Sequence, residues 1–187
     1  MKKLLLILFI FGCENTITDS PENDDYGVII NEINYNSSSD LNAEDWIELY
    51  NPTNETILIE FWEFKDSNDD NVFILPENAV LIPGGYLVLC ENLNEFSQIF
   101  PDVSSLIGDF EFGLEGAGEK IRLFDSNQSL VDEVEYDDES PWPLEPDGTG
   151  PTLELIDSST DNNLGENWAT SNNNGGTPGQ TNSVTNE

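Results

Sequence analysis

The sequence predicts an all-β sandwich or barrel, and two observations carry this prediction. From Val28 onward, short runs rich in Val, Ile, Phe, Tyr and Trp alternate with clusters of Asn, Asp, Gly and Pro, which is the spacing of short strands and turns. The chain also contains four Trp and ten Phe among its 187 residues, which is not the composition of a disordered chain. Once a leader is removed, about 175 residues remain, enough for one domain with its own core.

The first half of the chain is predicted to contain five strands. In the second of them, Trp46, Glu48 and Tyr50 alternate with Ile47 and Leu49, as they do in a half-buried strand. The acidic stretch KDSNDDN is predicted to join the third and fourth strands as a hairpin, and PGG forms a turn before the last strand. The predicted strands are 28–35, 45–51, 56–64, 71–75 and, after the short apolar run AVLI, 86–90.

The second half is predicted to continue with strands and one short helix. Residues 120–125 and 130–136 form a hairpin around SNQ, and 151–157 supply a late strand. A helix is expected around 94–100, because Pro101 cannot continue it. After Ser158 we expect an irregular segment that is held to the domain by the indole of Trp168 and is loose from Ser183.

The N-terminus reads as a secretory signal. Lys2 and Lys3 precede an apolar run, residues 4–11, which is too short to cross a bilayer because a spanning helix needs ~20 apolar residues. Residues 10–13, IFGC, resemble the lipobox of bacterial lipoprotein signal peptides. This resemblance implies that Cys13 is the first residue of the mature chain and is acylated on its sulfur and its new amino group. An ordinary secretion signal with a chance cysteine is the alternative.

The predicted organisation follows from this signal. Residues 1–12 are the lipoprotein signal peptide, 13–26 an acidic flexible tether, 27–182 the domain, and 183–187 a loose C-terminal end. The expected location is extracytoplasmic, at the bacterial outer membrane or cell surface, with the membrane as a partner through the lipid anchor. If Cys13 carries lipid, Cys90 has no disulfide partner, and we expect it to be a small apolar residue in or near a strand.

The charge of the chain excludes one class of partner. There are 38 acidic and 5 basic residues, so the formal charge is −33, and removal of Lys2 and Lys3 makes it −35. Such a field repels nucleic acid and anionic lipid headgroups and favours cations or basic partners. We therefore expect no nucleic-acid binding. The alternative is that the acidity serves only solubility in a salty medium.

The order of segments resembles the lamin tail domain family in its bacterial extracytoplasmic form. Two departures stand out: Phe61 precedes Trp62 where the family usually has Gly, and SNQS replaces a Gly-containing turn. The resemblance implies an immunoglobulin-like β-sandwich, which in bacteria occurs on secreted or surface proteins, alone or beside hydrolase and nuclease domains. The matching segments are IINEI (29–33), DWIELYNPTN (45–54), PGGYLVL (83–89), GLEGAGEKIRLFD (113–125), LVDEVEY (130–136), WPLEPDGTGPTLEL (142–155), Trp168 and GGTPGQTN (175–182).

Catalysis is not expected. The chain has no histidine, which excludes Ser-His and Cys-His nucleophile systems and His-containing metal sites. A pair of carboxylates could still perform glycosidase chemistry, but 38 acidic residues produce such pairs by chance. Glu32, Glu48 and Asp132 lie in otherwise apolar strands, and we expect them to face outward or to accept hydrogen bonds from loop backbone.

The predicted hairpin loop contains candidate ligands for a calcium ion, which would be the cofactor of this domain. Asp66, Asn68, Asp70 and Glu77 occupy positions 1, 3, 5 and 12 of an EF-hand count, and Ca²⁺ prefers such oxygen ligands. Asn71 stands where an EF-hand requires Gly, and the flanks are predicted strands, so a true EF-hand is rejected. The open alternatives are a looser Ca²⁺ site and an ordinary turn, which Asp and Asn also favour.

The sequence therefore predicts a non-catalytic, lipid-anchored binding or adhesion module with an unidentified protein or glycan partner. Trp62, Trp142 and Trp168 are candidates for an exposed contact surface, although large aromatic residues in a sandwich more often belong to the core. Two other functions stay open: a structural envelope scaffold, and a calcium-stabilised accessory domain that acts with a separate secreted hydrolase.

Overall fold

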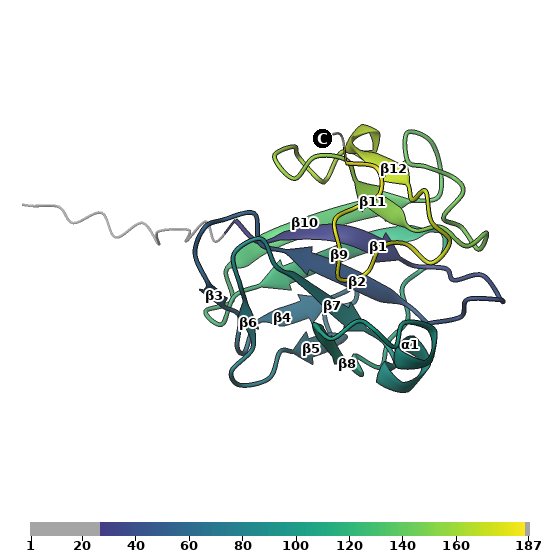
Figure 1. The fold of residues 1–187 in the computed structure, drawn as a ribbon. Helices are drawn as coiled ribbons and strands as arrows, with labels where there is room; N and C mark the ends of the chain where they lie inside the picture. Colours follow the sequence, from purple (N-terminus) through teal and green to yellow (C-terminus); the bar gives the residue numbers. More distant parts are fainter. Residues whose placement is uncertain (1–26, 186–187) are drawn as a thin grey trace, which may run out of the picture.

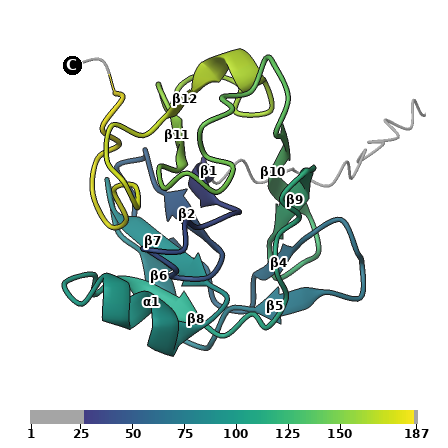
Figure 2. The ribbon, with the colours of Figure 1, turned by 90° about the vertical axis from the view of Figure 1, so that its right-hand side faces the viewer.

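The protein is a β-sandwich of two sheets that pack face to face (Figures 1 and 2). The computed structural model describes residues 27–185, so the predicted signal peptide, Cys13 and the predicted tether lie outside the described residues. Among residues 27–185, no helix is long and apolar enough to cross a membrane. The predicted all-β sandwich is confirmed.

The larger sheet has six strands in the order β12-β11-β1-β2-β7-β8. All neighbours are antiparallel except β7 and β8, which run parallel. The short β8 was not predicted, because three residues leave too little pattern to detect. The six strands are β12 (Trp168–Thr170), β11 (Leu153–Leu155), β1 (Ile29–Asn34), β2 (Trp46–Tyr50), β7 (Tyr86–Cys90) and β8 (Leu106–Gly108).

The smaller sheet has four strands in the order β10-β9-β4-β5, and two further strands, β3 and β6, pair with each other. Both predicted hairpins are confirmed, since β4 pairs with β5 and β9 with β10 in antiparallel ladders. The strands are β10 (Leu130–Asp137), β9 (Gly118–Phe124), β4 (Glu63–Lys65), β5 (Val72–Ile74), β3 (Ile57–Leu58) and β6 (Val80–Leu81).

The single strand predicted over 56–64 is wrong, because the chain bends between β3 and β4. Phe61 has a φ of 61°, in the left-handed region that L residues rarely adopt. Its amide still donates to the Leu75 carbonyl at 3.0 Å, and the Ile59 amide donates to the Ala79 carbonyl. The two strand pairs are therefore one bent ribbon, and the bend falls where the family usually has Gly.

The SNQS turn between β9 and β10 also contains a left-handed residue. Gln128 has a φ of 66°. We expect Gln128→Gly to raise the free energy of unfolding by up to about 1 kcal/mol, because glycine adopts this conformation without the ~1 to 2 kcal/mol steric cost. Urea denaturation measures the change. The control is Gln128→Ala, which also removes the 2.7 Å bond from Gln128 Nε2 to Glu63 Oε1 but keeps Cβ, and it should not stabilise the protein. Equal changes in the free energy of unfolding for Gln128→Gly and Gln128→Ala would show that the backbone at Gln128 is not strained.

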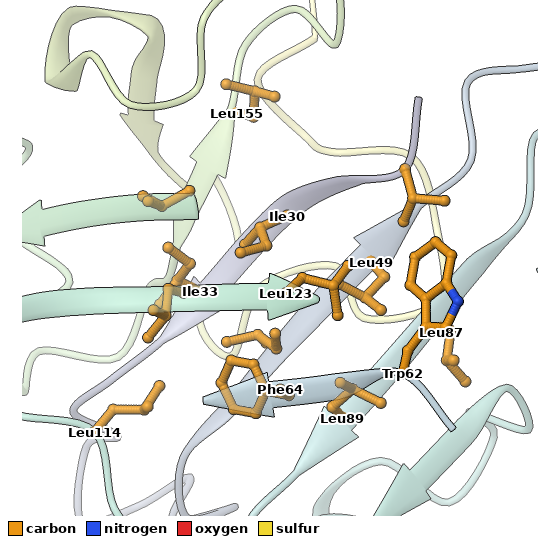
Figure 3. Packing of buried hydrophobic residues seen from close by; sticks show 14 of the residues in the cluster. Ile30, Ile33, Leu49, Trp62, Phe64, Leu87, Leu89, Leu114, Leu123 and Leu155 are labelled. Carbon is orange, nitrogen blue, oxygen red and sulfur yellow. The ribbon is translucent and has the colours of Figure 1, made fainter. Parts of the chain in front are cut away.

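The core lies between the two sheets. Figure 3 shows the rings of Trp62 and Phe64 among leucines of the facing sheet. Trp62, Trp142 and Trp168 are only 2%, 7% and 3% exposed, so their proposed role as exposed contact residues is wrong and they belong to the core. Cys90 is buried at the end of β7, as expected of a small apolar strand residue.

A single short helix covers one edge of the six-stranded sheet. It spans α1 (Leu93–Ile99), one residue earlier than predicted, and Asn92 caps its N-terminus by accepting from the amides of Asn94 and Glu95. Its Phe96 joins a second, smaller apolar cluster with Ala43, Trp46, Val88 and Cys90.

The C-terminal part is more regular than predicted. Trp168 begins β12, which pairs with β11, and its indole Nε1 donates to the Asn162 carbonyl at 2.7 Å, as expected of a residue that pins the segment. The predicted loose end at Ser183 is wrong. Ser183 Oγ and the Val184 amide donate to Glu154 Oε2 at 2.7 and 3.2 Å, so the domain extends at least two residues beyond the predicted boundary.

Candidate functional site

Three glutamates lie side by side across three neighbouring strands. Glu32 on β1 is directly opposite Glu154 on β11 and Glu48 on β2. Side chains alternate between the two faces of a strand, so Glu48 and Glu154, whose chain neighbours face the core, point to the other face of the sheet. All three glutamates are 0% exposed. The sheet therefore carries a buried row of carboxylates on its outer side.

The chain between residues 171 and 184, here called the C-terminal segment, covers this row. Figure 2 shows it in yellow outside the six-stranded sheet, on the side facing away from the other sheet. The Thr177 amide donates to Glu32 Oε1 at 2.9 Å, and the Gly179 amide donates to Glu48 Oε2 at 2.5 Å. These two bonds attach the middle of the segment to the two central strands.

The third carboxylate binds both ends of the segment. Ser171 Oγ and Thr177 Oγ1 donate to Glu154 Oε1 at 2.7 and 2.8 Å. The other oxygen of Glu154 accepts the bonds from Ser183 and Val184 described above. Each oxygen of Glu154 thus has two donors from one stretch of chain, which is how a carboxylate becomes a structural anchor for a loop.

Gly176 shows why the segment needs a glycine where it crosses Glu32. Its φ is 76°, and a Cβ placed on it would overlap Glu32 Oε1 and lie 2.6 Å from Thr152 Oγ1. Only a residue without Cβ permits this approach.

Burial controls the ionisation of the row. Burial, and then the charge of Glu48, raise the pKa of Glu32 well above its ordinary value. Burial, and to a smaller degree the charge of Glu154, raise the pKa of Glu48 from 4.5 to about 8. No lysine or arginine donates to any of the three among the described residues. Because burial and a neighbouring charge both disfavour ionisation, Glu32 and Glu48 hold protons at neutral pH.

Asp132 performs a similar function in the other sheet. Its Oδ2 accepts from the Ile30 amide at 2.6 Å and from Asn162 Nδ2 at 2.8 Å, and burial raises its pKa to about 6. It thereby connects β10, β1 and the loop before β12. Glu32 and Glu48 face away from the core and also accept hydrogen bonds from loop backbone, as expected, while the C-terminal segment covers them. The backbone donor to Asp132 is instead Ile30, which lies in strand β1.

The carboxylates are not placed for catalysis. The three glutamates of the row are fully buried, and none of them lines the four surface hollows of about 150 to 340 Å³ beside the C-terminal segment and β7. A general acid or base must come within hydrogen-bond reach of its substrate. These groups reach only the protein itself.

The predicted calcium ligands form a turn. Asp66 Oδ1 accepts from the Asn68 amide at 2.7 Å, Asp66 Oδ2 accepts from Asn71 Nδ2 at 2.6 Å, and Asn68 Oδ1 accepts from the Asp70 amide. Arg122 Nη1 donates to Asp69 across this loop at 2.8 Å. Across residues 27–185, the His, Cys, Asp and Glu side chains form no group of three or more that could hold a metal ion. The structure does not bring Asp66, Asp70 and Glu77 together.

We therefore expect Ca²⁺ to have no effect on the loop. Millimolar CaCl₂ should leave Tm unchanged relative to the same ionic strength of NaCl, because a ligand stabilises only when it binds the folded state. Differential scanning calorimetry measures this. A Tm rise with Ca²⁺ that disappears in Asp66→Asn would instead restore the calcium site.

Several large apolar side chains are exposed on the surface of the domain. Among residues 27–185, nine large apolar side chains are exposed, and six of them lie between Leu58 and Ile82. Leu58, Val80 and Ile82 form what is here called the apolar ribbon. The sequence did not single them out, because AVLI and TILIEFWEF are apolar on both faces of the strand, and only the fold decides which face is covered.

Comparison with protein families matches residues 21–138 to the family described as Lamin Tail Domain. The match includes Glu32, Glu48 and Asp132 but ends before Glu154 and the C-terminal segment. A search of curated proteins found no match.

Proposed function

The chain belongs to the lamin tail domain family, and from this premise we propose that it is a lipid-anchored, non-catalytic module of the cell envelope that binds a protein or glycan. The family is a group of immunoglobulin-like interaction domains. One observation carries the non-catalytic part: Glu32, Glu48 and Glu154 are fully buried and are occupied by bonds within the protein. What the domain offers to other molecules is therefore its surface.

The anchor is Cys13. Several acyl chains on one cysteine hold a protein stably, because each buried CH₂ contributes ~0.8 kcal/mol. Thirteen residues separate this cysteine from Gly27, where the described domain begins. Such an arrangement displays a binding domain on an envelope membrane.

The charge limits the partner. With a formal charge of −33 over the whole chain, the protein repels nucleic acid, and its surface suits a neutral glycan or a protein with basic groups. A structural scaffold would differ from a binding module in its location, because a scaffold can lie inside the envelope and need not face the outside of the cell.

Proteolysis of intact cells tests the proposal. Cells carrying the native protein are treated with an external protease, and Cys13→Ala is the control for anchoring. Loss of the domain from whole cells, together with release of Cys13→Ala from the membrane fraction, supports an outward-facing anchored module. A protected but membrane-bound domain favours the internal scaffold. If Cys13→Ala stays on the membrane unchanged, the anchor is wrong.

Activity is tested separately. We expect no turnover when the purified protein is incubated with polysaccharides or nucleic acids. Detectable turnover of either kind of substrate would contradict the non-catalytic assignment, and its loss in Glu48→Gln would place the reaction at the glutamate row.

A further inference from the structure

We propose that the apolar ribbon, Leu58, Val80 and Ile82, is a membrane-docking surface that lies against zwitterionic lipid of the bilayer in which Cys13 is anchored. This inference rests on the lipid anchor of the proposed function. It assigns the ribbon one occupant, the bilayer interface, and it fixes which end of the domain faces the membrane.

The ribbon presents one continuous apolar face. Leu58 and Val80 are directly opposite each other in the β3–β6 pair, and Ile82 follows two residues later on the same side. These side chains are 62%, 45% and 59% exposed, whereas their strand neighbours Ile57 and Leu81 are buried. The pair belongs to neither of the two main sheets, so no strand of the sandwich covers it.

The ribbon lies at the end of the domain where the chain enters from Cys13. A Cβ placed on Gly27 would meet Thr53 Cγ2 at 2.9 Å, so the first described residue lies against the turn after β2. The Thr53 amide donates to Asn51 Oδ1, and Asn51 Nδ2 donates to the carbonyls of Leu81 and Ile82 at 3.0 and 3.1 Å. A short chain of contacts thus connects the start of the domain to the ribbon.

The anchor makes a weak contact effective. Thirteen residues span at most about 47 Å when fully extended, at ~3.6 Å per residue, so the bilayer is always within reach of this end. Tethering converts docking into an intramolecular event with a high effective concentration. Three exposed aliphatic side chains are then sufficient, although the same chains would hold a free domain only briefly.

Charge selects the type of lipid. Glu55, Glu60 and Glu77 lie near the ribbon in sequence. The three basic residues of the described chain, Lys65 on β4 and Lys120 and Arg122 on β9, each form an ion pair with an acidic side chain. Anionic headgroups would be repelled at this end, whereas zwitterionic headgroups would not. The expected surface is therefore a phosphatidylcholine or phosphatidylethanolamine interface.

The test places an additional tryptophan on the ribbon. The lipidated full chain carrying Leu58→Trp is reconstituted into phosphatidylcholine vesicles whose acyl chains carry bromine, which quenches nearby tryptophan. The matched control is Leu164→Trp, because Leu164 is also exposed but lies shortly before β12, a strand that is distant from β3 and β6 in Figure 1. The four native tryptophans give the same background in both chains.

We expect bromine to quench the added tryptophan at least about twofold more at position 58 than at 164, and the difference to shrink in phosphatidylglycerol-rich vesicles. Equal quenching at both positions in protein that floats with the vesicles overturns the proposal and leaves the anchor intact. Concentration-dependent dimers that shield position 58 without lipid overturn it in favour of a second copy. Failure of the wild-type chain to float overturns the anchor and the docking together.

Discussion

Gly176→Ala is expected to lower the free energy of unfolding by roughly 2 to 5 kcal/mol. The left-handed backbone at Gly176 costs an L residue about 1 to 2 kcal/mol. The new Cβ also displaces Glu32, which leaves the buried Thr152 hydroxyl and Thr177 amide without their acceptor, at about 1 to 3 kcal/mol. Urea denaturation followed by tryptophan fluorescence measures the loss.

Gly84→Ala is the matched control. Gly84 also has a left-handed φ, of 63°, but a Cβ placed there meets no atom within 4 Å. It should therefore show only the backbone cost of about 1 to 2 kcal/mol. The excess loss in Gly176→Ala reports the contact with the glutamate row. Equal losses in the two variants would mean that the C-terminal segment is not held by Glu32.

The second large effect is a loss of stability as pH rises. Glu48 has a pKa of about 8 in the folded protein and an ordinary value of 4.5 when unfolded. Between these two values the folded state keeps a proton that the unfolded state has released. The stabilisation is complete below pH 4.5 and falls by about 1.4 kcal/mol per pH unit until pH approaches 8.

Other buried acids change stability in the same direction. Burial raises the pKa of Asp45 to about 7 and that of Asp132 to about 6, and it raises that of Glu32 as well. Hydrogen bonds lower the pKa of Glu63, Glu145 and Asp157 and give an opposite effect at acid pH. This effect is small, because Glu145 and Asp157 are exposed and Glu63 is only partly buried. We therefore expect a higher Tm at pH 5 than at pH 8.5.

Glu48→Gln tests whether Glu48 causes this pH dependence of the free energy of unfolding. Glutamine cannot ionise, so the pH dependence of the free energy of unfolding should become shallower by about one proton between pH 5 and 8. Glu55→Gln, at an exposed position, removes the same charge and should leave the slope unchanged. An identical slope in the wild type and in Glu48→Gln would show that the proton is held elsewhere.

The sequence predicted most of the strands because their alternation is local. The pattern of β2 and the turn residues at 65–71 and 126–128 placed both hairpins correctly. It failed at 56–64, where a left-handed Phe61 breaks an unbroken apolar run. It also failed for β12, whose three residues pair with β11 only because the fold brings them together.

The candidate site could be predicted only in part. Glu32 and Glu48 stood out as acids in apolar strands, but Glu154 did not, and only the register of β11 beside β1 places it in the same row. Residues 175–182 stood out only as a segment that resembles the lamin tail domain family, and nothing in them pointed to the glutamates. Three strands each carry an acid in the middle, and the C-terminal end is rich in Gly and Thr. This combination is the signal that could have linked the three glutamates to the C-terminal segment.

Amide hydrogen exchange tests the role of the buried row most directly. The amides of Thr177, Gly179 and Val184 each donate to one of the three glutamates. At pH 6 we expect these amides to exchange as slowly as those of the central strand β2, and to lose protection selectively in Gly176→Ala. Exchange at the rate of an exposed loop, while β2 stays protected, would show that the carboxylates do not hold the C-terminal segment.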